Sequence, residues 1–142
     1  MLRRIDDGLF VSAQIDLGTI AVAAAQGVTL IINNRPEGES PDQTPGPDIE
    51  AKARAAGIDY VAIPVTHAGF SQIQVEAMVK ALESSEGAVL AYCRSGTRST
   101  LLWALARASQ GDHPETLFEM AANAGYDLTP IEMMLDMLHE KS

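Results

Sequence analysis

Short apolar runs alternate with amphipathic helical patterns along most of the chain. Runs rich in Val, Ile, Leu and Ala predict four strands, over residues 8–11, 28–32, 58–65 and 88–92. The spacing of apolar positions predicts helices over residues 17–26, 48–56, 71–83 and 99–111, with two more beyond residue 112. Strands and helices in this order need right-handed crossovers. We therefore predict an α/β fold with a mainly parallel central sheet flanked by helices on both faces.

Residues at the helix ends support these boundaries. Gly27 and Gly57 stand directly after predicted helices, where a left-handed cap favours glycine. Ser71 and Gln74 have the spacing of a capping box, which predicts a helix start. Pro, Gly, Glu and Asp dominate between residues 33 and 47, so we expect a long loop there.

Residues 112–142 are predicted to add two C-terminal helices to the same domain. Asp112 and Thr129 each stand three residues before a glutamate and shortly before a proline, which is typical of a helix start. The last helix carries an apolar face that we expect to be core, formed by Met133, Met134, Leu135, Met137 and Leu138. The alternative for this face is an exposed surface that binds a partner.

Composition and charge narrow the function. A chain of 142 residues with 46% hydrophobic residues can bury one core, so we expect a single domain over residues 1–142. The formal net charge of −9 disfavours nucleic acid and a membrane surface as partners. Charged residues between Arg3 and Asp7 interrupt the start of the chain, and we expect no signal peptide. Because a single cysteine cannot form an internal disulfide, a cytoplasmic location is expected.

The only cysteine opens the segment CRSGTRS, residues 93–99. This segment joins a predicted strand to a predicted helix, so its backbone N–H groups and the helix N-terminus would surround an anion. We predict that Cys93 is a thiolate nucleophile and that Arg98 binds an oxyanion through two hydrogen bonds. The other predicted anion-binding residues of the loop are Arg94, Ser95, Gly96, Thr97 and Ser99.

Two more segments follow strands at the same predicted edge of the sheet. Asn34 and Arg35 are expected to line the anion pocket, and Glu37 is a candidate ion-pair partner for Arg35 or Arg98. The alternative is a solvated loop that only connects two elements. His67 is a candidate catalytic residue, or a surface or packing histidine. We expect no metal and no cofactor, because no Cys and His cluster has ligand spacing.

The chain also resembles known families. The segment CRSGTRS resembles the active loop of rhodanese-type sulfurtransferases, and residues 60–99 are similar to dual-specificity phosphatases in their order of strand, loop, helix, strand and Cys loop. Both features meet in a bacterial family, the beta-lactamase-hydrolase-like proteins, phosphatase-like domain, whose members are also labelled sulfur transferases. The segments LFVSAQI, LIINNRPEGESPDQ, IPVTHAG and CRSGTRSTLLWA resemble this family, and the similarity covers about residues 5–110. It implies a cysteine-phosphatase-like fold with Cys93 as the nucleophile and Arg98 as the oxyanion ligand.

Two departures from the phosphatases favour sulfur chemistry. Four residues, instead of five, separate Cys93 from Arg98, and residues 66–70 contain no aspartate that would protonate a leaving oxygen. We therefore expect sulfane-sulfur transfer, in which Cys93 takes a sulfur from thiosulfate or a small persulfide and a thiol acceptor removes it. The alternatives are hydrolysis of a phosphoester through a phosphocysteine, and a non-catalytic module that binds an anion or senses oxidants. The resemblance also implies a persulfide-oxidising or metallohydrolase partner, since such domains are sometimes fused.

Overall fold

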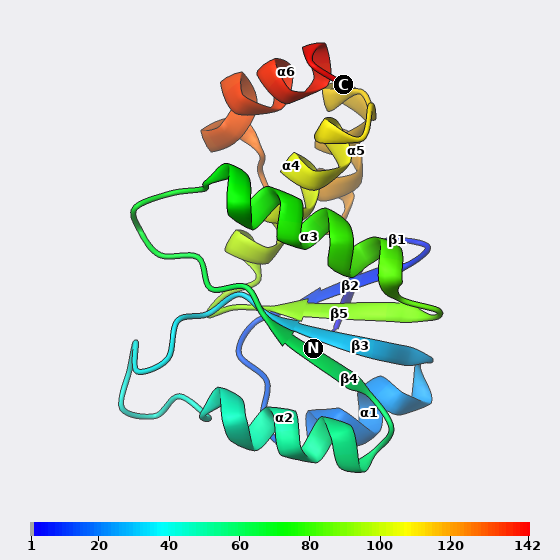
Figure 1. The fold of residues 1–142 in the computed structure, drawn as a ribbon, viewed down its shortest axis with the longest axis vertical. Helices are drawn as coiled ribbons and strands as arrows, with labels where there is room; N and C mark the ends of the chain where they lie inside the picture. The colour runs from blue at the N-terminus through cyan, green and yellow to red at the C-terminus, as the bar shows by residue number, and fades with distance from the viewer. Residues whose placement is uncertain (1) are drawn as a thin grey trace.

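A five-stranded sheet forms the centre of the molecule in the computed structural model, which describes residues 2–142 (Figure 1). The strands are β1 (Arg3–Asp6), β2 (Leu9–Ser12), β3 (Val28–Asn33), β4 (Asp59–Ala62) and β5 (Ala88–Tyr92). Their order in the sheet is β1-β2-β5-β3-β4, with β1 antiparallel to β2 and every other neighbouring pair parallel. The predicted α/β fold with a mainly parallel sheet is confirmed.

Helices cover both faces of this sheet. α1 (Thr19–Ala25) and α2 (Gly46–Ala55) lie on one face, and α3 (Gln72–Ser84) and α4 (Thr97–Ser109) lie on the other (Figure 1). α5 (Pro114–Asn123) and α6 (Glu132–Glu140), with a short 3-10 turn at Thr129–Ile131, pack against α4. Within residues 2–142, no helix combines the length and the apolar character needed to cross a membrane.

The central strand β5 divides the interior into two cores. Val89 and Ala91 belong to the core shared with α3 and α4, whereas Leu90 and Tyr92 belong to the core shared with α1 and α2. This alternation is what a strand buried on both faces requires, because successive side chains point to opposite sides. The strand delivers the chain to Cys93 at the carboxyl edge, where ligands gather in parallel sheets.

The strands at the edges of the sheet differ from the prediction. β1 was not predicted, because Arg3, Arg4 and Asp6 are polar and only Ile5 is buried, so no apolar run marks the strand. β4 ends at Ala62 instead of residue 65. The Ile63 and Val65 N–H groups still donate to the Asn33 and Asn34 carbonyls, but these acceptors are consecutive residues, so the regular parallel register ends there.

The predicted capping contact forms at one helix start and is missing at two, although α5 begins at Pro114 and the 3-10 turn before α6 begins at Thr129. Ser71 and Gln74 form both hydrogen bonds of a capping box at the start of α3. At α5, Asp112 does not cap the helix, because its carboxylate pairs with Arg107. The N-cap is instead His113, whose side chain makes no capping bond. Thr129 begins the 3-10 turn, and its hydroxyl donates to Asp127 instead of capping a helix.

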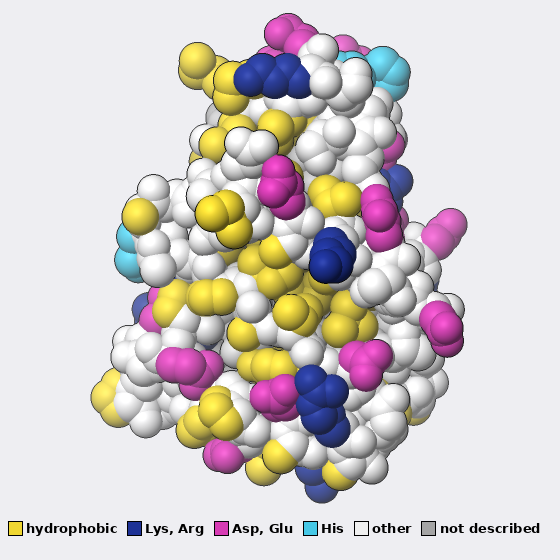
Figure 2. All heavy atoms as spheres, viewed as in Figure 1, with side chains coloured by type: hydrophobic (Ala, Val, Ile, Leu, Met, Phe, Trp, Pro, Cys, Tyr) yellow, Lys and Arg dark blue, Asp and Glu magenta, His cyan; other side chains and the backbone are white. Residues whose placement is uncertain are grey.

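The methionine face of α6 was only partly predicted correctly. Leu135 is buried and Met134 and Leu138 pack against the core, but Met133 is 87% exposed and Met137 is 47% exposed. A face of five apolar residues is wider than the contact that α4 offers, so its margin remains in solvent. Figure 2 shows hydrophobic side chains at the end of the molecule that α6 forms, and acidic side chains spread over the rest of this view.

Candidate active site

Cys93 lies at the end of β5 and at the N-terminus of α4. The turn between them passes through Gly96, whose φ of 90° is a left-handed conformation that favours glycine. The Gly96 N–H donates to the Cys93 sulfur at 3.1 Å, and α4 begins at the next residue. A backbone donor and the N-terminal end of a helix therefore converge on the sulfur. The Cys93 side chain is completely buried.

The remaining loop residues divide into exposed and buried groups. Arg94, Ser95 and Thr97 are exposed, and the Ser95 hydroxyl donates to the Thr97 hydroxyl at 3.1 Å. Ser99 is fully buried in the first turn of α4, and its hydroxyl has no hydrogen-bond partner among the described residues. A buried hydroxyl without a partner is uncommon in folded proteins, and binding of an anion by Ser99 stays a prediction.

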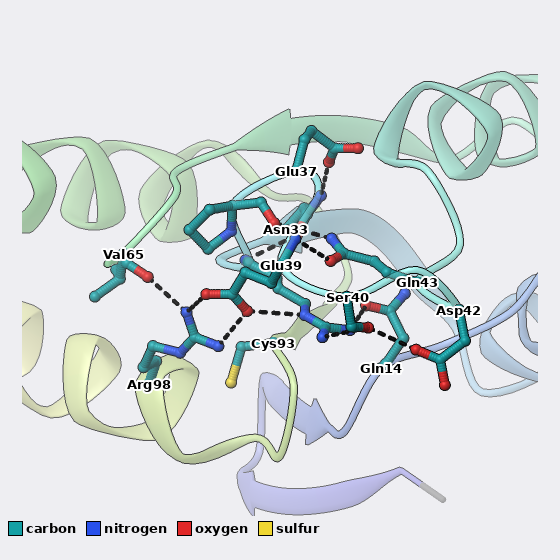
Figure 3. A network of polar contacts seen from close by, with 12 residues as sticks. Gln14, Asn33, Glu37, Glu39, Ser40, Asp42, Gln43, Val65, Cys93 and Arg98 are labelled. Carbon is teal, nitrogen blue, oxygen red and sulfur yellow. Dashed lines mark hydrogen bonds and ion pairs between the residues drawn. The ribbon is translucent and has the colours of Figure 1, made fainter. Parts of the chain in front are cut away.

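Arg98 is held next to Cys93 by a carboxylate that the sequence analysis did not assign. Arg98 Nη1 donates to Glu39 Oε2 at 2.8 Å and Nη2 donates to Glu39 Oε1 at 2.8 Å, which is a two-bond ion pair (Figure 3). Nη1 also donates to the Val65 carbonyl at 2.7 Å. These three bonds use both N–H groups of Nη1 and one N–H group of Nη2. The other edge, Nε–H with the second Nη2–H, bonds to no oxygen among residues 2–142, and the Cys93 sulfur lies near this guanidinium.

The ion pair between Arg98 and Glu39 shifts the pKa values of both residues. The hydrogen bond from Arg98, against an opposing effect of burial and with a smaller contribution from Arg35, lowers the pKa of Glu39 from 4.5 to about 2. The pKa of Arg98 is raised, chiefly by its hydrogen bond to Glu39 and in part by the nearby Cys93 sulfur. Glu39 is therefore an anion and Arg98 a cation throughout the physiological pH range.

Arg35 holds Glu39 from the other side. Its Nε donates to Glu39 Oε1 at 2.9 Å, and its two terminal nitrogens donate to Gln14 and Ser40. The Arg35 side chain is only 4% exposed, so its position is fixed by these bonds. The predicted role of Arg35 beside the anion pocket is thus carried by a contact with the partner of Arg98, and direct binding of an anion by Arg35 stays a prediction.

The predicted partner role of Glu37 is wrong. Its Oε1 accepts from the Gly46 N–H at 2.8 Å, and its Oε2 accepts from Asn33 Nδ2 at 3.4 Å, so Glu37 closes the loop onto the start of α2. The Glu37 carboxylate is already used by these two contacts. Glu39, two residues later in the same loop, is the carboxylate that reaches Arg98.

Asn34 and His67 are not drawn into this network. Asn34 is fully buried, and its Nδ2 donates to the Ile63 carbonyl at 2.9 Å, which ties β3 to the chain after β4. Its Oδ1 is buried without a partner among the described residues. His67 is exposed on the loop that follows β4, two residues after Val65, whose carbonyl binds Arg98. A role for either residue in the reaction stays a prediction.

Sequence reasoning missed Glu39 and also Tyr126, whose hydroxyl donates to the Ser95 carbonyl at 3.3 Å. Neither residue carries a local signal, because one lies in a polar loop and the other between two C-terminal helices. The four-residue spacing from Arg35 to Glu39 is the only hint, since it matches the ion pair that the loop forms. Over residues 2–142, no group of three or more His, Cys, Asp or Glu side chains could hold a metal ion.

The arrangement defines a class of protein: an α/β domain with a cysteine-phosphatase-like fold, in which one strand-to-helix loop carries both Cys93 and Arg98. A structure of PTPMT1 has this fold, with a TM-score of 0.79 over 99% of this chain and 95% of that chain, and at 15% identity the likeness is one of fold alone. The chain belongs to the family described as Beta-lactamase hydrolase-like protein, phosphatase-like domain, whose model matches residues 1–110. The predicted family is thereby confirmed.

Two relatives make the comparison more specific. A crystal structure from Neisseria meningitidis Z2491, provisionally called a phosphatase, is 31% identical with a TM-score of 0.84 and covers 96% of both chains. The Beta-lactamase hydrolase-like protein of Xylella fastidiosa (strain Temecula1 / ATCC 700964) is 37% identical over 126 residues, 87% of this chain. The chain spans only 29% of that relative's length. These names agree better with a phosphatase-type hydrolase than with the sulfur transfer that we expected from the loop.

Proposed function

We propose that this domain is a cysteine-dependent phosphatase-type hydrolase that acts on small phosphomonoesters. The observation that carries the proposal is the placement of the Cys93 sulfur, which accepts a hydrogen bond from the Gly96 N–H and lies near the Arg98 guanidinium. In this arrangement the guanidinium can bind a tetrahedral anion, and the thiolate can attack the central atom of that anion. The family, and the phosphatase-like neighbours, support the same chemistry.

The reaction proceeds in two displacements. The Cys93 thiolate attacks phosphorus, the bond from phosphorus to the ester oxygen breaks, and the alkoxide or phenolate leaves with the electron pair and takes a proton from solvent or from His67. Water then attacks the phosphocysteine, the sulfur–phosphorus bond breaks, and inorganic phosphate leaves while the thiolate is restored. Arg98 and the backbone N–H groups of residues 94–98 stabilise the charge on the non-bridging oxygens in both steps.

The leaving group decides which esters react fast. Glu39 cannot protonate it, because its pKa of about 2 keeps it ionised and both of its oxygens bind arginines. The loop after β4, residues 66–70, contains His67 as its one titratable side chain. Esters of acidic alcohols, such as aryl phosphates, leave without help, so these are the expected substrates, and His67 is the proposed acid for poorer leaving groups.

Access to the sulfur requires a movement. Cys93 has no exposed surface, and the segment that carries Glu39 lies beside Cys93 and Arg98 (Figure 3). The segment that carries Glu39, residues 34–45, contains no helix or strand and is fixed by side-chain contacts. We therefore expect this segment to shift when an anion binds, while the loop of residues 93–98 stays in place.

Sulfane-sulfur transfer is the second candidate. The observation that favours it is the four-residue spacing between Cys93 and Arg98, together with residues 66–70, which contain no carboxylate. In that reaction the Cys93 thiolate attacks the outer sulfur of thiosulfate, the sulfur–sulfur bond breaks and sulfite leaves without a proton. A thiol acceptor then removes the sulfur from the persulfide on Cys93.

A partner with persulfide-oxidising or metallohydrolase activity also remains a proposal. The curated relatives are named Beta-lactamase hydrolase-like proteins, and most of their length lies outside the match with this chain. Copurification of the chain with such a protein from its native cells would support the proposal.

Turnover of an aryl phosphate tests the proposed function. Phosphate release should require Cys93 and should fall steeply as the pKa of the leaving alcohol rises. His67→Asn should leave aryl phosphate turnover within about threefold and slow alkyl phosphates more, if His67 supplies the proton. Equal turnover by wild type and Cys93→Ser would contradict a cysteine-dependent hydrolase.

A further inference from the structure

Tyr126 contacts the back of the cysteine loop from the connection between α5 and the 3-10 turn. Its hydroxyl donates to the Ser95 carbonyl at 3.3 Å. The same hydroxyl fills the space beside Gly96, because a Cβ at that position would collide with it and lie 3.4 Å from the Ser12 backbone. Tyr126 therefore contacts the loop at Gly96, the position that has no room for a side chain.

The Ser95 carbonyl and the Gly96 N–H belong to one peptide group. The carbonyl accepts from Tyr126, and the N–H donates to the Cys93 sulfur at 3.1 Å. A hydrogen bond to the oxygen of a peptide group polarises it and strengthens the donation by its N–H. The contact with Tyr126 also opposes rotation of this peptide group, which the glycine would otherwise permit.

Tyr126 is itself held firmly. Its N–H donates to the Ala121 carbonyl at 2.9 Å, and its ring lies beneath the guanidinium of Arg3 at 5.6 Å. Arg3 Nη1 donates to the Ala124 carbonyl at 2.9 Å, so β1 and the end of α5 fix the ring together. Burial raises the pKa of the Tyr126 hydroxyl, which therefore remains a hydrogen-bond donor at neutral pH.

We propose that Tyr126 is a positioning residue that keeps the Ser95–Gly96 peptide group turned with its N–H toward the Cys93 sulfur. The proposal deepens the proposed function and rests on Cys93 as its nucleophile. The family model ends at residue 110, so the C-terminal helices contribute to the site from outside the matched segment. Removing the Tyr126 hydroxyl weakens the donor on the sulfur and makes the thiolate harder to form.

The test is an ultraviolet titration of the thiolate in Tyr126→Phe. Cys93 is the only cysteine, so the thiolate absorbance comes from one group, and the same variant with Cys93→Ser gives the background. The midpoint of the titration should rise by about 0.5 to 1 pH unit relative to wild type, the effect of weakening one hydrogen bond to a charged group. Arg98 and Glu39, the charged groups near the sulfur, are the same in both proteins.

Tyr60→Phe is the matched control, because the Tyr60 hydroxyl is also bonded, to Asn33 Nδ2 at 2.9 Å, but does not touch the cysteine loop. Its midpoint should equal that of wild type. Arg3→Gln, which frees the Tyr126 ring, should raise the midpoint by a smaller amount and serves if Tyr126→Phe does not fold. An unchanged midpoint in folded Tyr126→Phe, or in Arg3→Gln where that variant replaces it, overturns the proposal.

The titration is independent of turnover. If the midpoint shifts but no phosphoester is hydrolysed, the positioning role stands and the proposed hydrolase function fails. If wild type hydrolyses aryl phosphates and the midpoint does not shift, the function stands and the role of Tyr126 fails. In an active enzyme, Tyr126→Phe should lower kcat below the shifted midpoint and leave KM within about twofold, because Tyr126 does not touch the substrate.

Discussion

Two loops meet at the carboxyl edge of the sheet, and they are held in place in different ways. The loop of residues 93–98 is fixed by its backbone, since it joins β5 to α4 through one left-handed glycine. The loop of residues 34–45 is fixed by side chains. Glu37 bonds to both of its ends, at Asn33 and Gly46, Gln43 bonds within it, and Glu39 bonds to Arg98. The first loop supplies the nucleophile Cys93. The second supplies Glu39, which orients Arg98 next to that nucleophile.

The difference teaches where substitutions should be tolerated. A loop held by its backbone tolerates changes in exposed side chains such as Arg94 and Thr97, but it does not tolerate a change at Gly96. A loop held by side chains tolerates a change at its glycine, but its effect on the site depends on Glu39, the carboxylate that reaches Arg98. The predictions below test this contrast.

Substitution of the reacting residues should have the largest effect. Cys93→Ser should reduce aryl phosphate turnover to background, a loss on the order of a millionfold in enzymes with a covalent nucleophile. Arg98→Lys should cost about a thousandfold, because a lysine cannot bind an anion and Glu39 with two parallel pairs of bonds. Steady-state kinetics with circular dichroism as a folding control measures both, and near wild-type activity in Arg98→Lys would contradict the assigned role.

Glu39→Gln should have the next largest effect, with Glu37→Gln as the matched control in the same loop. Loss of the ion pair frees the Arg98 guanidinium to turn, and misplacement of such a group lowers kcat/KM by about tenfold to a hundredfold. Glu37→Gln should stay within about threefold, since Glu37 bonds only to Gly46 and Asn33. If the two variants had equal activity, Glu39 would not orient Arg98.

A pair of glycine substitutions compares the two loops directly. Gly96 and Gly38 both have positive φ, of 90° and 74°, but a Cβ at residue 96 meets Tyr126 whereas a Cβ at residue 38 meets nothing within 4 Å. Gly38→Ala should cost only the backbone strain, about 1 kcal/mol of unfolding free energy, while Gly96→Ala should cost clearly more and lower activity about tenfold. Urea unfolding and kinetics together decide the outcome, and equal costs would remove the contrast.

Acid should weaken the side-chain loop in a defined pH window. The pKa of Glu39 is about 2 in the fold and near 4.5 when unfolded, so its stabilising contribution is complete above pH 4.5 and is lost as the pH falls toward 2. Wild type should be about 2 kcal/mol more stable than Glu39→Gln at pH 7, and this gap should narrow below pH 4.5. Unfolding curves at pH 7 and pH 3 measure the gap, and a gap that widened in acid would contradict the assignment.

The same contrast explains what could be predicted from the sequence. The loop of residues 93–98 was predicted because strand, glycine and helix leave a local pattern, and the order of β5, Cys93 and α4 was therefore correct. The strand β1 was not predicted, because its pairing with β2 compensates for a polar sequence. Long-range pairing of this kind leaves no periodic signal.

Side-chain contacts between distant segments were the other limit. The sequence indicated a carboxylate partner for Arg98 but assigned Glu37, because residues 33 to 47 lack any period that fixes which side chain turns inward. Tyr126 bonds to Ser95 across 31 residues of chain, and only the packing of α5 and α6 on α4 brings them together. The spacing between Cys93 and Arg98 was counted correctly, but it alone does not determine which atom the cysteine attacks.

Intact mass spectrometry of the reduced protein during turnover tests the central claim most directly. The protein is incubated with an aryl phosphate and, separately, with thiosulfate, then quenched in acid, with Cys93→Ser as the control. The account predicts a transient gain of one phosphoryl group on Cys93 from the aryl phosphate, with phosphate release that depends on Cys93. A stable gain of one sulfur atom from thiosulfate, removed by an added thiol and without any phosphoryl adduct, would contradict it and establish sulfur transfer instead.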